Sequence, residues 1–318
     1  GSRLFSMSGF NEQISSINPY MVKEIRLMKG GYGPQYGNQT GGIAEIMGIN
    51  GNRAKPELKL NLNNLTANIF GSVPVGKRAT ISAAYRQTYY GLYDVNVLNP
   101  YGKRGANQVS SAPGNGKNSG NNQESIYITP DYNFRDANLK LSGDLSDNSH
   151  YYISLYGASD RFEYSISGEE FSLDAFDRNN QISASAGFDK NWKGGSSSGI
   201  NFRYSALDNN SSKAVRLNRE NYYTIDTDNM GTEAGAKIRH SFTVLSINNI
   251  EAGAGADNLS DVLNDSTSNE NKFNFYINDR VNLRKLSLDL GLRGDLYRQK
   301  IYIQPRFSLK YNVLENLS

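Results

Sequence analysis

Residues 286–295, LSLDLGLRGD, decide the fold that this sequence predicts. Leucines at 286, 288, 290 and 292 share one face of a β-strand, because successive side chains point to opposite faces. The opposite face carries Asp289, Arg293 and Asp295. Runs at 139–145, 200–206 and 306–313 alternate in the same way. The sequence therefore predicts an all-β protein whose sheet has one apolar face and one charged face.

The composition excludes several classes of protein. The chain of 318 residues has 34 Lys and Arg against 31 Asp and Glu, a formal charge of +3 that is too small and dispersed to indicate a nucleic-acid partner. Cysteine is absent, which excludes disulfides, thiolate metal sites and a Cys nucleophile. No run approaches the roughly 18 apolar residues of a membrane helix, and no secretory signal peptide is recognised at the start. Strands that cross a membrane are still compatible with the absence of such a run, because their signal lies in the alternation of apolar and polar residues.

The connections between the expected strands alternate in length. Short turns are expected at 74–77, 147–149, 193–196, 243–246 and 283–285, and longer polar connections at 91–133, 165–180, 208–229 and 258–271. Bacterial outer-membrane barrels have short periplasmic turns and longer outer loops. About 12 strands are expected from residue 57 onward, with weak patterns near 57–73 and 232–240. This alternation of short and long connections favours a transmembrane antiparallel β-barrel.

A soluble β-sandwich or propeller is the alternative, because its strands alternate too. Three features count against it: full charges on the polar face, no repeat of 20–50 residues, and aromatic residues near the turns, where an interfacial girdle would lie. These aromatic residues are Tyr89, Tyr90, Tyr151, Tyr152, Trp192 and Tyr297. Alternation alone leaves both architectures open.

The first 50 residues differ from the rest of the chain. Short β-like runs at 22–29 and 43–49 flank a glycine-dense turn at 30–42. Glycines at this density indicate backbone with positive φ, or backbone packed tightly against another part of the protein.

The order of residues in 17–46 resembles the end of the plug domain of TonB-dependent outer-membrane receptors. That family's plug closes with a strand ending in Lys-Gly, then Tyr-Gly, then a Gly-Gly pair before its last strand. The residues here that match this plug motif are Ile25, Leu27, Lys29, Gly30, Tyr36, Gly37, Gly41, Gly42 and Glu45. Residues 291–295, GLRGD, and 305–311, PRFSLKY, resemble a pattern from the middle of the same family's barrel.

The resemblance implies a domain organisation. Residues 1–50 would be the C-terminal part of a plug domain inside the lumen, and residues 51–318 the N-terminal half of the barrel, about 12 of 22 strands. The family's signal peptide, TonB box and remaining plug would precede Gly1, and further strands would follow Ser318, so we expect an internal fragment. A closed barrel of 12 strands is the competing architecture, but about 50 residues of plug need a wider lumen.

The resemblance also implies a function and a location. A receptor of this family lies in the outer membrane of a Gram-negative bacterium and imports a nutrient such as a siderophore, glycan or peptide. Its implied partners are outer-membrane lipids, the TonB energy-transducing complex acting through the missing N-terminus, and a surface lipoprotein or other outer-membrane subunit. No enzyme activity and no cofactor are expected. The alternatives are a scaffold subunit of an outer-membrane complex without transport, and a soluble β-rich adhesin.

Candidate contact residues fall into three groups. Lys29 and Glu45 are expected to form ion pairs with the barrel wall, while the plug glycines are expected to be structural turns. Charged residues on the polar face could bind a polar cargo, or could solvate the lumen or pair with the plug: Arg86, Lys140, Asp144, Arg203, Arg280, Asp289 and Arg293. Tyrosines in and beside the loop 91–133 could stack on a sugar, aromatic siderophore or peptide: Tyr89, Tyr90, Tyr93 and Tyr101.

Motifs of enzymes and metal sites fail on inspection. Residues 114–118 are not a P-loop, because Ser111 replaces the first glycine and Asn118 replaces Ser or Thr. Residues 226–231 fail the EF-hand pattern, because Met230 takes a ligand position and Lys237 stands in place of the bidentate Glu. The two histidines are too far apart for a local zinc motif. No metal site is expected from these motifs, although a looser Ca²⁺ site among loop carboxylates stays open.

Overall fold

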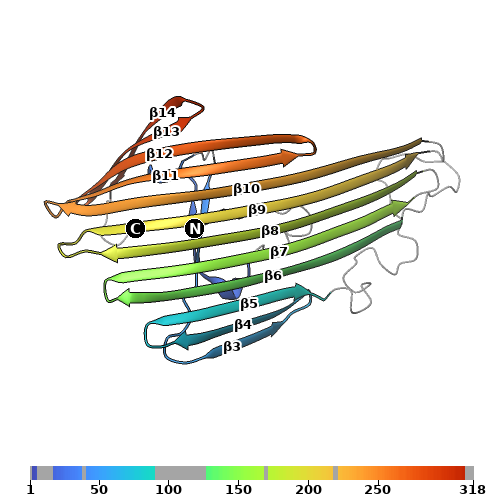
Figure 1. Ribbon diagram of the computed structural model, residues 1–318, viewed down its shortest axis with the longest axis horizontal. Helices are drawn as coiled ribbons and strands as arrows, with labels where there is room; N and C mark the ends of the chain where they lie inside the picture. The colour runs from blue at the N-terminus through green and yellow to red at the C-terminus, as the bar shows by residue number, and fades with distance from the viewer. Residues whose placement is uncertain are drawn as a thin grey trace, which may run out of the picture.

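The computed structural model describes residues 2–5, 17–37, 41–89, 127–167, 171–217 and 221–311. Twelve antiparallel strands form one large sheet, here called the wall, in the order β14 to β3 without crossovers (Figure 1). Two further strands, β1 (Val22–Met28) and β2 (Ile43–Gly48), form a small sheet that follows a 3-10 turn, η2 (Pro19–Met21). The wall strands are β3 (Glu57–Leu62), β4 (Thr66–Val75), β5 (Ala79–Thr88), β6 (Tyr127–Ser146), β7 (Ser149–Ser167), β8 (Phe171–Asn191), β9 (Ser197–Leu217), β10 (Asn221–Val244), β11 (Asn248–Leu263), β12 (Ser266–Leu283), β13 (Leu286–Tyr297) and β14 (Lys300–Tyr311).

The predicted short turns are present, and each is tight. Gly194 and Gly195 between β8 and β9 have φ of 90° and 83°, a conformation that only glycine adopts without strain. The described part of the chain has no helix that is both long and apolar enough to cross a membrane.

Three of the predicted long connections are wrong. Residues 165–180, 208–229 and 258–271 mostly continue the strands, so that β9 has 21 residues and β10 has 24. Their polar side chains resemble a loop in sequence, but backbone pairing with at least one neighbouring strand continues there, and polarity alone does not end a strand. These strands are longer than the 9–11 residues that cross a bilayer. At the fourth predicted loop, β6 already begins at Tyr127.

The wall has the two faces that the alternation predicts. On β13, Leu290 and Leu292 are 46% and 42% exposed, whereas Arg293, on the opposite face of the same strand, is 4% exposed. The leucine row is therefore not packed against a second sheet in the described structure. Cross-strand register extends this outer apolar face from β4 to β14, with Phe275, Ile277 and Phe307 among its exposed residues.

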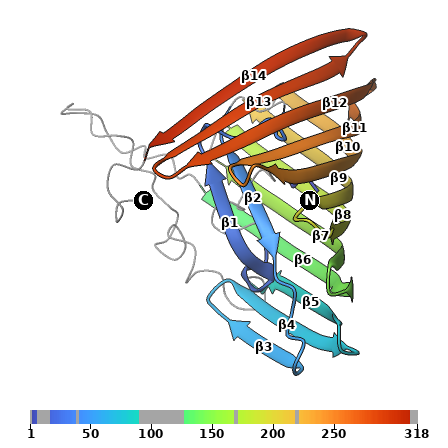
Figure 2. The ribbon, with the colours of Figure 1, turned by 90° about the vertical axis from the view of Figure 1, so that its left-hand side faces the viewer.

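The small sheet lies within the curve of the wall, on the polar inner face (Figure 2). We name the described residues between 2 and 56 the inner segment. Phe70 of β4, buried completely, packs with Met21 and Ala84, and Tyr20 and Ile49 border them. A second inner cluster of Tyr132, Phe134, Tyr156 and Ala158 borders Leu4 near the chain start. Small apolar cores thus hold the inner segment at two places on an otherwise polar face.

Candidate functional site

The contact between the inner segment and the wall begins at Asn18. This residue is fully buried, and its Nδ2 donates to Asn68 Oδ1 of β4 at 2.9 Å. Asn68 Nδ2 donates back to Asn18 Oδ1 at 3.1 Å, and the same oxygen accepts from the Tyr20 backbone N–H. Because a buried amide without partners is costly, this reciprocal pair fixes the start of β1 against β4.

The glycine-rich turn after β1 is held by three wall cations, which we name the clasp. Their donors meet four successive carbonyls: Arg306 Nη1 reaches Tyr32 O at 3.0 Å and Gly33 O at 2.7 Å, Arg293 Nη1 reaches Pro34 O at 3.1 Å, and Lys237 Nζ reaches Gln35 O at 3.3 Å. Charge-assisted hydrogen bonds are stronger than neutral ones. The clasp therefore ties a turn without regular secondary structure to β10, β13 and β14.

Arg293 is the centre of the clasp. It is buried and also pairs with Asp295, whose Oδ1 lies 2.6 Å from Arg293 Nη2. A Cβ at Gly37 would collide with the Arg293 guanidinium, and a Cβ at Gly291 would come within 2.9 Å of the Pro34 ring. The absence of side chains at these two glycines lets Pro34 reach full burial against the wall.

A second set of contacts holds the linker where the inner segment leads into β3. Lys140 Nζ of β6 donates to Gly48 O at 2.8 Å and to Asn50 Oδ1 at 2.7 Å. The hydroxyls of Thr80 and Ser142 donate to Asn50 O. Gly51 has a φ of 75° and lies against the hydroxyls of β4 and β5, so a side chain would be both strained and obstructed there.

The start of the described chain also lies on the inner face. Ser205 Oγ of β9 donates to Arg3 O at 2.6 Å, and the Phe5 backbone N–H donates to Gln181 Oε1 at 3.2 Å. Glu233 of β10 joins Arg3, at 3.5 Å, to Arg203, at 3.3 Å. The inner segment thus contacts the wall from β4 to β14.

The seven charged candidates all share the inner face by strand register. Three of them contact the inner segment: Lys140, Arg293, and Asp144, which pairs with Arg53 and lies 2.9 Å from His150. The other four pair within the wall: Arg86 with Asp136, Arg203 with Glu233 and Asp257, and Arg280 with Asp289 at 2.8 Å. Their charges are therefore used in structural pairs.

The plug-motif residues differ in their surroundings. Tyr36 donates its hydroxyl proton to Glu45 Oε2 at 3.2 Å, and burial, followed by the Glu45 charge, raises the pKa of Tyr36 to about 12. Gly42 lies close to the Met28 carbonyl, whereas Gly30 and Gly41 have open space around them. Ile25, Leu27 and Lys29 are exposed. Among the residues that the structure describes, neither Lys29 nor Glu45 forms an ion pair with the wall. The inner segment is attached instead by wall cations that donate hydrogen bonds to its backbone carbonyls.

Of the loop tyrosines, Tyr89 directly follows β5. Its hydroxyl donates a hydrogen bond to Asn63 O, and its backbone N–H donates to Leu65 O at 3.3 Å. Tyr90, Tyr93 and Tyr101 lie outside the described residues. Within the described ranges, no group of three or more His, Asp or Glu side chains is placed to hold a metal ion.

Sequence reasoning missed Arg306, Lys237, Asn18 and Gly51. Arg306 stands on the polar side of an alternating run, so its face was predictable, but its partners lie more than 270 residues away. Lys237 lies in a run whose alternation is weak, and nothing in the sequence around Asn18 indicates its partner on β4, which is 50 residues away.

Comparison with known proteins supports the fold. The sequence matches no protein-family profile, and no curated protein matches it by sequence. Among solved structures, it is similar to a Q482A mutant of the ferric enterobactin receptor PfeA of Pseudomonas aeruginosa in complex with enterobactin. The TM-score is 0.57, with 14% identity over 93% of this chain and 48% of the receptor. A complex of PfeA with BCV-L6 gives a TM-score of 0.58 at the same identity and coverage. The chain therefore has the fold of about half of a TonB-dependent receptor barrel, and it spans about half the length of these receptors.

Proposed function

We propose that this chain is part of a plugged outer-membrane barrel that imports a nutrient when an energised partner pulls on its plug. Residues 1–50 are the end of that plug and residues 51–318 are barrel wall. The observation that carries the proposal is the clasp: charged residues of β10, β13 and β14 hold the Tyr32–Gln35 carbonyls on the inner face, while the outer face is apolar.

The outer face supports the membrane placement. On β8, the outward residues from Ile182 to Phe188 are apolar, and a strand rises about 3.3 Å per residue. The belt therefore covers about 20 Å along β8, against the roughly 25 Å apolar band of outer-membrane barrels. Closed pairing of every strand is how a barrel satisfies its backbone in lipid. Among possible cargoes, an iron–siderophore complex is favoured by the similarity to ferric enterobactin receptors.

The mechanism follows from how the inner segment is held. Its contacts with the wall are mainly polar, through side chains that a water-filled lumen could solvate once they separate. Pulling on the chain before residue 17 would load the Asn18–Asn68 pair and the clasp in turn. Energised rearrangement therefore opens a path along the inner face without unfolding the wall.

Thiol labelling tests energised movement without knowledge of the cargo. Pro34→Cys introduces a single thiol into these 318 residues, which contain no cysteine, at a fully buried position. Any cysteine elsewhere in the full-length protein is replaced by serine. In cells expressing the full-length protein, a small maleimide is expected to label this thiol when TonB and the proton gradient are present, and to leave it unlabelled when they are absent. Leu245→Cys, at a position that is 82% exposed, is the control and should be labelled in both conditions.

Protection of Pro34→Cys in both conditions would contradict import and favour a scaffold. Labelling in both conditions would contradict a clasp that closes the resting state.

A further inference from the structure

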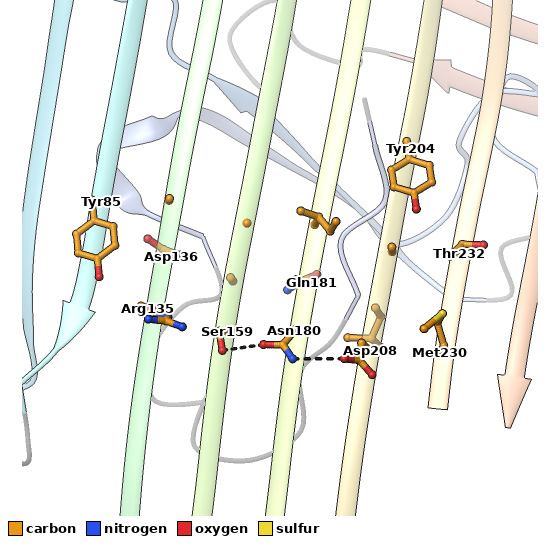
Figure 3. A pocket seen from close by; sticks show the side chains of 16 residues that line it. Tyr85, Arg135, Asp136, Ser159, Asn180, Gln181, Tyr204, Asp208, Met230 and Thr232 are labelled. Atoms are coloured by element: carbon orange, nitrogen blue, oxygen red, sulfur yellow. Dashed lines mark hydrogen bonds between the residues drawn. The ribbon is translucent and has the colours of Figure 1, made fainter. Parts of the chain in front are cut away.

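The outer face carries a depression of about 700 Å³ across β5 to β10, on the side opposite to the inner segment (Figure 3). Cross-strand register places Tyr85, Ala137, Gly157, Ile182, Ala206 and Thr232 in one row of this face. Three of these residues are Ala or Gly, which leaves a trough. Tyr85 and Tyr204 stand on its two sides.

The trough lies where the apolar belt ends. The row nearer the short turns contains Leu139, Leu155 and Tyr204, whereas the row beyond the trough is polar. In that polar row Ser159 Oγ donates to Asn180 Oδ1 at 2.8 Å, and Asn180 Nδ2 lies 3.4 Å from Asp208 (Figure 3). A molecule in the trough would thus contact apolar side chains at one end and polar ones at the other.

Three arginines border the polar end on adjacent strands: Arg135 on β6, Arg161 on β7 and Arg178 on β8. Arg161 lies directly opposite Arg178, and Arg135 is opposite Ser159, two residues before Arg161. Arg161 is paired with Glu163 at 2.7 Å, and the Asp208 carboxylate accepts from Asn180 and, at 3.0 Å, from Asn210. Within the described residues Arg135 and Arg178 form no ion pair, so the β6–β8 side keeps an excess of positive charge.

We propose that this depression binds a phosphorylated membrane lipid, with an acyl chain in the trough and its phosphate on Arg135 and Arg178. Guanidinium groups match phosphate oxygens in geometry and charge, and the two tyrosines suit the boundary between acyl chains and headgroups. The assignment rests on the membrane placement proposed above. It concerns the lipid-facing surface, which transport through the lumen does not use.

The charge component is tested by titrating the full-length protein in detergent with phosphatidic acid and reading bound lipid by native mass spectrometry. Arg135→Gln combined with Arg178→Gln is expected to weaken phosphatidic acid binding roughly 30-fold, about fivefold for each charge removed at a membrane surface. Arg216→Gln, on the same face further along β9 and exposed, is the matched control and should bind as the wild type does. Phosphatidylcholine should bind more weakly than phosphatidic acid to the wild type.

The trough is tested separately with glycines. A Cβ at Gly157 would meet its nearest atoms at 3.9 Å, and one at Gly71, on the outer face of β4, at 3.8 Å, so both sites accept a larger side chain. Gly157→Leu fills the trough and is expected to lower phosphatidic acid affinity roughly tenfold, the equivalent of nearly two buried methylene groups. Gly71→Leu should leave the affinity unchanged.

Wild-type affinity in the double arginine variant would overturn the inference, and so would equal loss in the two glycine variants. Displacement of the lipid by millimolar inorganic phosphate would also overturn it, because it would indicate a site for free anions. Insertion into vesicles, read from the heat-dependent shift on electrophoresis, separates this inference from the proposed function. A wild type that inserts but binds both lipids equally refutes only the lipid site, whereas failure to insert refutes the membrane placement itself.

Discussion

Arg293→Ala is expected to free the glycine-rich turn from the wall. The substitution removes the hydrogen bond to Pro34 O and leaves Asp295, 7% exposed, without its guanidinium partner. Breaking a buried ion pair from one side typically costs about 3–5 kcal/mol. Limited proteolysis of the full-length protein should then cut within residues 32–37, which are buried or half-buried in the wild type.

Arg280→Ala is the matched control for this prediction. Arg280 lies on the same inner face of the adjacent strand and also pairs with an aspartate, Asp289 at 2.8 Å, but its side chain is 56% exposed. An exposed pair contributes about 0–1 kcal/mol. Within the described part of the chain Arg280 forms no hydrogen bond or ion pair with the turn, so the proteolytic pattern should stay as in the wild type. Equal cleavage in both variants would mean that the clasp does not hold the turn.

Arg86→Met is expected to destabilise the wall itself. Arg86 and Asp136 form an ion pair across β5 and β6 with side chains 6% and 0% exposed, and the guanidinium lies 5.0 Å from the centre of the Phe134 ring. Removing the arginine leaves a buried carboxylate uncompensated, at a cost of about 3–5 kcal/mol. Denaturant unfolding of the full-length protein in lipid vesicles measures this loss.

A second variant separates charge from packing. Arg86→Met combined with Asp136→Leu removes both charges together, and such replacements are often neutral or stabilising, so most of the lost stability should return. Arg78→Met, which breaks the exposed pair with Asp147, should cost about 0–1 kcal/mol. A double variant as unstable as Arg86→Met would refute an origin in the unpaired carboxylate.

The sequence predicted the strands of the wall and their faces well, because alternation is a local property. The leucines at 286–292 and the charges at 289, 293 and 295 fall on opposite faces as expected. Strand lengths were predicted poorly at residues 208–229, where β9 and β10 continue. Pairing with a neighbouring strand decided the structure there, and no short window of sequence contains that pairing.

The contacts of the inner segment could be predicted only in part. Arg293 and Lys140 were placed on the inner face by alternation, yet their acceptors are backbone carbonyls, which no residue type identifies. Lys29 and Glu45 were expected to pair with the wall because they are charged. In the structure Glu45 instead accepts a hydrogen bond from the hydroxyl of Tyr36, a neighbour within the inner segment.

Quenching of tryptophan by brominated lipids tests most directly whether the apolar face of the wall meets the bilayer. Trp192 is the single tryptophan of these 318 residues, so Trp192→Phe, together with Phe at any tryptophan elsewhere in the full-length protein, gives a silent background. Into it, Trp is placed one position at a time at 287, 288, 289 and 290 of β13. Quenching should alternate, strong at 288 and 290 and weak at 287 and 289; equal quenching at all four positions, or the reverse alternation, would contradict a wall with lipid outside and the inner segment within.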